Sequence, residues 1–267
     1  MKNFNIKRFW YTFRWYVIEN RNMLLLGTAG LALGIFLTEM FTIWMGSRYP
    51  DGPYLAHRTM IIALSFCMLI IVIAQYAAFS SIFSLLKKRQ KRIAFLTLPA
   101  TNLERYLAVL IFTIVVWPIC IFGAYVLGEL LRMLVTGILG LGWYSNIGIF
   151  FKSFFNIKES WTWAEVVSTA LFYSLLLWTC SVFVLGGTWF RKYSFLIVVL
   201  SIVALFIAIF KIFPRAELIN ISDTSTTVNS SAYVVILLLT AFSLFNFWLS
   251  YQIFKRFQII TSKWTNV

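Results

Sequence analysis

The feature that most constrains this chain is a series of long apolar runs separated by short polar segments. The runs cover residues 23–45, 59–86, 106–128, 165–188, 194–213 and 232–253. At about 1.5 Å per helical residue, each is long enough to cross roughly 30 Å of hydrocarbon. Because backbone polar groups in lipid must be satisfied within their own segment, each run is predicted to be a helix. We therefore expect an all-α integral membrane protein with six transmembrane helices, in which residues 1–267 form a single transmembrane domain.

Composition supports this interpretation and excludes an ordinary soluble domain. Hydrophobic residues make up 61% of the chain and charged residues only 12%, whereas a soluble domain is nearer half apolar and a quarter charged. The formal net charge is +14, which in a soluble protein would suggest nucleic acid as a partner. Here the cations lie between the apolar runs, so they are interpreted as topology signals and contacts with lipid headgroups, without nucleic-acid binding.

The distribution of lysine and arginine predicts the orientation. Of the 23 cationic side chains, 16 lie in the two termini and in the segments after the second and fourth runs, and 7 lie on the other side. Positive charge accumulates on the cytoplasmic side of membrane proteins. We therefore expect both termini and the segment 87–105 in the cytoplasm, and a multi-pass protein of a bacterial inner (cytoplasmic) membrane.

Two segments outside the runs have patterns of their own. Residues 3–20 place Phe9, Phe13, Tyr16 and Val17 on one side of a helix, which predicts an amphipathic helix lying in the membrane interface. The segments 46–58 and 214–231 are rich in turn-forming or polar residues and are predicted to be loops.

The region 129–163 follows the third run. Glu129 and Arg132 are spaced to pair on one helix face. The apolar pieces 133–141 and 147–155 are each too short to span a bilayer. We interpret 129–163 as an extracytoplasmic interfacial or re-entrant segment. The alternative is that this region forms an additional pair of spans. Topology does not exclude it, because two more spans would leave both termini on the same side.

Few polar side chains in the runs are candidates for function. Glu39 and Gln75 lie inside the first and second runs, where polar groups face protein or a water-filled path. They are the candidates for a translocation path, although Glu39 at headgroup level and simply hydrated is an equal alternative. The three cysteines lie in apolar runs without ligand spacing, and the single histidine has no partners, so no catalytic, cofactor-binding or metal site is expected.

The densest charge lies between the second and third runs. Five cations occupy the six positions 87–92, and a short apolar stretch follows. Leu98-Pro99 favours a break in the helix. Thr101 and Glu104 then have the spacing of a capping box, which fixes how the next helix begins. We interpret 87–105 as a rigid cytoplasmic elbow that can transmit motion from a soluble partner. The alternative is a solvated positive loop that contributes only to topology.

The run Arg92-Ile93-Ala94-Phe95-Leu96-Thr97-Leu98-Pro99-Ala100-Thr101-Asn102-Leu103-Glu104-Arg105 resembles the coupling helix of ABC-2 (type V) exporter membrane subunits. The resemblance implies a permease that works with a separate ATPase subunit and with a second copy of this chain or a related membrane subunit. It assigns ATPase coupling to Arg89, Arg92, Phe95, Leu96, Leu98, Pro99, Thr101, Glu104 and Arg105. ATP and magnesium would bind the partner, because this chain has no Gly-x-x-x-x-Gly-Lys-Ser/Thr phosphate loop. The implied cargo is amphipathic: a lipid, lipid-linked glycan, peptide or drug.

Two other functions stay open at this point. A membrane enzyme acting on lipids would need clustered His, Asp or Cys at the interface, which this sequence does not offer. A non-transporting scaffold or sensor would use the same elbow to recruit a cytoplasmic partner. An ATPase that co-purifies with the chain would separate the transporter from the scaffold.

Overall fold

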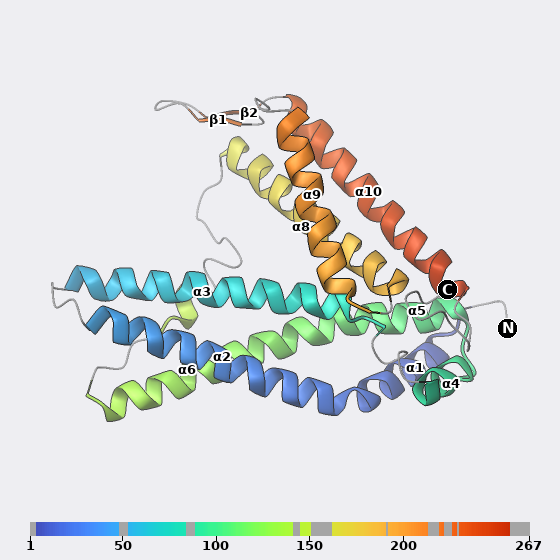
Figure 1. Ribbon diagram of the computed structural model, residues 1–267, viewed down its shortest axis with the longest axis horizontal. Coiled ribbons are helices and arrows are strands. Elements are labelled where there is room, and N and C mark those ends of the chain that lie inside the picture. Colours follow the sequence, from blue (N-terminus) through green and yellow to red (C-terminus); the bar gives the residue numbers. More distant parts are fainter. Residues whose placement is uncertain are drawn as a thin grey trace. The chain divides into compact units, whose positions relative to one another are not determined.

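The computed structural model describes residues 4–47, 53–83, 89–140, 145–150, 162–190, 192–212, 219–221, 226–228 and 230–256, and these residues are mostly helical (Figure 1). The helices are α1 (Ile6–Glu19), α2 (Arg21–Ser47), α3 (Pro53–Ser80), α4 (Arg89–Leu96), α5 (Asn102–Ile111), the π-helix η2 (Phe112–Val116), α6 (Trp117–Ile138), α8 (Trp163–Trp189), α9 (Ser194–Ile212) and α10 (Ser230–Lys255). The strands β1 (Ile219–Ile221) and β2 (Thr226–Val228) pair antiparallel.

Five helical segments are long and apolar enough to cross a membrane. They are Arg21–Met45, Ile61–Ser80, Asn102–Ile138, Trp163–Trp189 and Ser231–Lys255. The prediction of a helical, multi-pass membrane protein is therefore confirmed at this level. The remaining predicted run corresponds to α9, whose apolar stretch Ser194–Ala208 is shorter than the other five.

The helix of the second predicted run, α3, begins and ends earlier than the predicted bounds 59–86. α3 starts at Pro53, so the predicted loop 46–58 is wrong for its last six residues. Proline suits a first helical position because the amide hydrogen it lacks would have no intrahelical partner there. At the other end the helix stops at Ser80 and the chain turns through residues 81–83, although apolar residues continue to position 86. Residues 84–88 lie outside the described part of the chain.

The third helical segment is longer than predicted. It continues from Asn102 to Ile138, so residues 129–138 extend the same helix instead of starting a separate segment. Glu129 and Arg132 hydrogen-bond each other inside α6, and this pairing lets the helix continue through two charged residues. Of the rest of the region 129–163, residues 141–144 and 151–161 lie outside the described residues.

A π-helical turn interrupts this segment where proline occurs. η2 spans Phe112–Val116, and Pro118 lies in the first turn of α6. Because proline has no amide hydrogen, the normal helical bond to its preceding turn cannot form, and a π-turn accommodates the loss. The carbonyl of Thr113 accepts a hydrogen bond from Gln75 Nε2 at 3.4 Å. Of the two alternatives given for Gln75, contact with protein or with a water-filled path, the structure shows contact with another helix.

Among the described residues, β1 and β2 form an antiparallel pair in which Ile219 pairs with Val228. It falls in the segment 214–231, predicted as a loop. The alternation of β-branched and polar residues there is compatible with short strands, so a plain loop was the wrong interpretation for residues 219–221 and 226–228.

The contacts divide the chain into two compact units, described separately. The first contains residues 1–12, 76–109 and 158–267, and the second contains residues 13–75 and 110–157. In the second unit α2 packs on α6, and a Cβ added at Gly128 would meet the Ala32 carbonyl oxygen at 2.9 Å. A Cβ at Gly30 or Gly34 would meet nothing within 4 Å. The close approach of the two helices therefore occurs at Gly128, and Gly30 and Gly34 of α2 do not take part in it.

In the first unit α8 packs against both α9 and α10 (Figure 1). A Cβ added at Gly187 of α8 would meet the Ser80 carbonyl oxygen at 2.7 Å. Ser80 also pairs with Ser194 at the start of α9, with 2.9 Å between the hydroxyl oxygens. These contacts hold the end of α3 against α8 and α9, at the point where the chain leaves α3 toward the elbow.

Candidate functional site

The elbow between α3 and the third span is built from α4, a turn and the start of α5. α4 ends at Leu96, where the Thr97 backbone amide and hydroxyl both donate to the Ile93 carbonyl at 2.9 Å. The chain then turns through Leu98-Pro99-Ala100, as the proline predicted. Arg105 Nη2 donates to the Leu98 carbonyl. A side chain on α5 therefore holds the turn that precedes α5.

The predicted capping box at the start of α5 is confirmed. The Thr101 hydroxyl accepts from the Glu104 backbone amide at 3.2 Å, and Glu104 Oε2 accepts from the Thr101 amide at 2.8 Å. These two bonds satisfy amide groups that have no partner within the helix. The direction in which α5 leaves the elbow is thereby defined by local bonds.

Glu104 has a second role that its position in the sequence does not reveal. Its other oxygen, Oε1, accepts from the Asn5 backbone amide at 2.7 Å and from Arg8 Nη2 at 3.0 Å. The Glu104 side chain is 0% exposed. A carboxylate surrounded by these donors is held in its ionised form by charge-assisted hydrogen bonds. Glu104 therefore ties the beginning of α1 to the elbow.

The inner face of α4 packs on the C-terminal end of α10. Phe95 is 0% exposed, and its ring meets Phe254 edge-on with centroids 6.4 Å apart. Phe254 also stacks on Phe83 at 5.3 Å, and the Tyr106 hydroxyl donates to Ser250 at 3.2 Å. Side chains from the turn 81–83, α4, α5 and α10 thus form one aromatic cluster beneath the elbow.

The opposite face of α4 and its turn is open. We call Ile93, Ala94, Thr97 and Pro99, all exposed, the outer elbow face. Of the residues to which the resemblance assigned coupling, Arg92, Phe95 and Glu104 are buried, Leu96, Leu98, Thr101 and Arg105 are partly exposed, Pro99 is exposed, and the side chain of Arg89 lies outside the description. A partner would therefore contact Ile93 and Thr97 rather than Phe95. Ile93 and Thr97 are each two positions from Phe95, so on a helix they lie on the side away from it, and this spacing could have predicted the exposed face.

A second polar cluster lies in the unit that contains α2 and α6. Arg132 donates to Glu129, with Nε to Oε2 at 3.2 Å, as the spacing predicted. The same Nε lies 3.3 Å from Glu39 Oε2, and the Asn146 amide donates to Glu129 Oε1 at 2.7 Å. Glu39 is 1% exposed, so its carboxyl group faces protein and is not hydrated from the surface. The contact between Glu39 and Arg132 was not predicted, because the two residues lie in runs that are far apart in the sequence.

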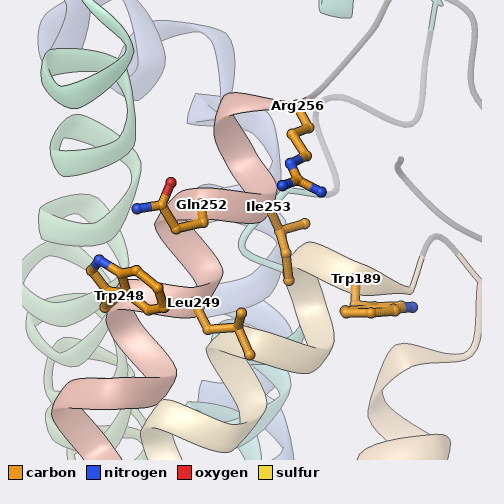
Figure 2. A pocket seen from close by; sticks show the side chains of 6 residues that line it. All are labelled: Trp189, Trp248, Leu249, Gln252, Ile253 and Arg256. Atoms are coloured by element: carbon orange, nitrogen blue, oxygen red, sulfur yellow. The ribbon is translucent and has the colours of Figure 1, made fainter.

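A pocket of about 630 Å³ lies between the C-terminal ends of α8 and α10 (Figure 2). It is lined by Trp189, Trp248, Leu249, Gln252, Ile253 and Arg256. Figure 2 shows Trp189 on α8 and the other side chains along the last turns of α10, with the Arg256 guanidinium at one end. An apolar wall with one cation suits an amphipathic molecule with an anionic group. Sequence reasoning did not find this pocket, since it joins two separate runs.

No family model, curated protein or solved structure matches this chain. In the part of the chain that the structure describes, no group of three or more His, Cys, Asp and Glu side chains could hold a metal ion. The geometry of the elbow, the buried cluster and the pocket therefore carries the functional argument.

Proposed function

We propose that this chain is the transmembrane permease subunit of an ATP-driven ABC transporter that exports an amphipathic cargo. The observation that carries the proposal is the elbow. It is a short cationic helix between two long apolar helices, and its inner face is packed while its outer face is exposed. Phe95 and Glu104 fasten it to α10 and α1, while Ile93 and Thr97 remain exposed. Such an element can receive a soluble partner without deforming when it is pushed.

The proposed topology has six spans and cytoplasmic termini. The 19 residues of α9 correspond to about 28 Å, close to the thickness of the hydrocarbon. Counting α9 as a span brings both termini and the elbow to the side that carries most of the lysine and arginine. α1 would lie in the interface, since Trp10 and Tyr11 are 59% and 69% exposed and suit the headgroup zone. A bacterial inner membrane is the proposed location.

In the proposed mechanism, the ATPase acts on this chain at the outer elbow face. A separate ATPase subunit would bind ATP and magnesium and dock there. Its closure would move α4 as a rigid body, because Phe95 and the Leu98 turn are held by contacts. The Thr101–Glu104 capping box would pass the movement into the third span, and the Glu104–Arg8 bond would pass it to α1.

Cargo would move along a path completed by a second copy of this chain or a related membrane subunit. The pocket beside Arg256 supports an amphipathic cargo with an anionic group, such as a lipid, because apolar side chains form most of its lining. Glu39 and Gln75 stay candidates for the translocation path.

The test is co-purification of the affinity-tagged chain with ATPase subunits from the same cells, followed by measurement of ATP hydrolysis in the complex. Ile93→Asp places a charge on the outer elbow face and is expected to remove the ATPase. Tyr193→Asp is the matched control, because Tyr193 is 65% exposed and lies on the same side in the proposed topology. The control is expected to retain the ATPase.

Two results would contradict the proposal. One is that no ATPase accompanies the wild-type chain. The other is that Ile93→Asp retains the ATPase as well as Tyr193→Asp does. A partner that needs Ile93 but does not hydrolyse ATP would instead support the non-transporting scaffold or sensor.

A further inference from the structure

The cluster of Glu39, Glu129 and Arg132 contains two carboxyl groups and one guanidinium. Their exposed fractions are 1%, 0% and 3%. Glu39 comes from α2, and the other two come from α6. Each charge taken from water into a protein interior costs several kcal/mol unless it is compensated. If both carboxyl groups are ionised, the three side chains together carry one uncompensated negative charge.

The hydrogen atoms of Arg132 do not satisfy both carboxyl groups. Its Nε carries a single hydrogen, and that hydrogen is donated to Glu129 Oε2 at 3.2 Å. Glu39 Oε2 lies 3.3 Å from the same nitrogen but receives no hydrogen bond in the structure. The other Glu39 oxygen lies 3.7 Å from the Cys67 sulfur, a weak donor. Glu39 Oε2 is therefore a buried oxygen beside a second carboxyl group, and no donor supplies it with a hydrogen bond.

Glu39 Oε2 and Glu129 Oε2 lie 3.3 Å and 3.2 Å from the same Arg132 nitrogen, so the two carboxyl groups are neighbours. Two neighbouring carboxyl groups can share a hydrogen bond only when one of them is protonated, since two carboxylates side by side repel each other. One proton would thus supply the missing hydrogen and neutralise the cluster. The proton belongs to the pair rather than to one residue.

We propose that Glu39 and Glu129 form a proton-binding site in which one shared proton, together with Arg132, makes the buried cluster neutral. A carboxylate takes one proton from water and becomes a carboxylic acid, whose O–H donates to the other carboxylate. Among the described residues, the titratable and charged groups that face Glu39 are Glu129, Arg132 and Tyr125 on α6 and Cys67 on α3. This site is independent of the proposed ATPase partner.

Two further buried polar atoms belong to the same part of the fold. The Tyr125 hydroxyl and the Asn146 side-chain oxygen are both buried without a hydrogen-bond partner in the structure. Asn146 belongs to the segment whose backbone binds Glu129, and Tyr125 is one helical turn before Glu129 on α6. Buried polar atoms of this kind are usually satisfied by an internal water.

Infrared difference spectroscopy of the purified full-length chain in lipid nanodiscs tests the proposal. The chain has only nine Asp and Glu residues, which makes a carboxylic-acid C=O band assignable. We expect such a band at neutral pH, shifted by D₂O. Glu39→Gln and Glu129→Gln should each remove it, because one carboxylate with one arginine needs no proton. Glu165→Gln, at a helix cap in the other unit, should leave it unchanged.

The outcomes are distinct even if one variant fails to fold, because two variants and the wild type are measured. A wild-type spectrum without the band overturns the proposal, as does a band that survives both Glu39→Gln and Glu129→Gln. Sodium in place of the proton would give no band and a higher unfolding temperature in sodium chloride than in choline chloride at equal ionic strength, and this too overturns it. Equal unfolding temperatures in the two salts, with the band present, support the proton.

Discussion

Glu104 accepts a 3.0 Å hydrogen bond from Arg8, 96 positions earlier in the chain. Arg8 is partly exposed, whereas the Glu104 carboxylate is fully buried. The same carboxylate caps α5, so a single side chain connects α1, the elbow and the third span. A movement of the elbow cannot leave α1 unaffected while this pair is intact.

The first prediction concerns that ion pair. Glu104→Gln should lower the free energy of unfolding by about 1.5–3 kcal/mol, because the buried side chain loses its charge and one of its two acceptor oxygens. Glu165→Gln changes the same position of the second capping box, Thr162–Glu165, where the carboxylate is not buried, and should cost less. Denaturant titration of the purified chain in detergent measures both. Adding Arg8→Gln completes a double-mutant cycle, and a coupling energy near zero would contradict the prediction.

The second prediction separates the two faces of α4. Phe95→Ala removes a ring that is 0% exposed and should destabilise the chain by about 3–5 kcal/mol. Ile93→Ala, on the outer elbow face, should change stability by about 0.5 kcal/mol or less. Thermal unfolding of the two variants provides the comparison. Similar losses at both positions would mean that the outer elbow face is packed in solution.

The third prediction concerns the contact of α2 with α6. Gly128→Ala would bring a Cβ to 2.9 Å from the Ala32 carbonyl oxygen and 3.0 Å from Ile35 Cγ2. Moving the helices apart should cost about 1–3 kcal/mol. Gly123→Ala, in the same helix, meets nothing within 4 Å and should be neutral or stabilising by up to about 1 kcal/mol. Gly128→Ala should therefore lower the unfolding temperature and Gly123→Ala should not, and a similar decrease in both variants would contradict this packing.

The fourth prediction concerns the π-turn. Gln75→Leu removes the bond to the Thr113 carbonyl and should cost about 0.6 kcal/mol, the average for a side-chain hydrogen bond between membrane helices. Gln90→Leu, at an exposed position of α4, is the control and should cost less. Denaturant titration can resolve the difference. A loss of several kcal/mol at Gln75 would indicate that it holds more than this one bond.

Local patterns predicted much of the fold, because the information they use lies within a few residues. The lengths of the apolar runs predicted the long helices, since a bilayer imposes that length on any spanning helix. Thr101 and Glu104 lie three positions apart, so their capping box required only the helix that they begin. The Glu129–Arg132 pair was likewise a property of one helix. The same local reasoning ended the third helix too early, since it treated this charged pair as a boundary.

What the sequence determined by itself was therefore the kind of chain and its local structure: long apolar helices, a proline turn and a capped restart after the cationic stretch. Only the tertiary structure decided which side chains meet across helices. It buried Phe95 against Phe254, joined Glu104 to Arg8 and placed Glu39 beside Arg132. The physical reason is that these contacts depend on the rotation and approach of helices far apart in sequence, which hydrophobicity along one helix does not specify.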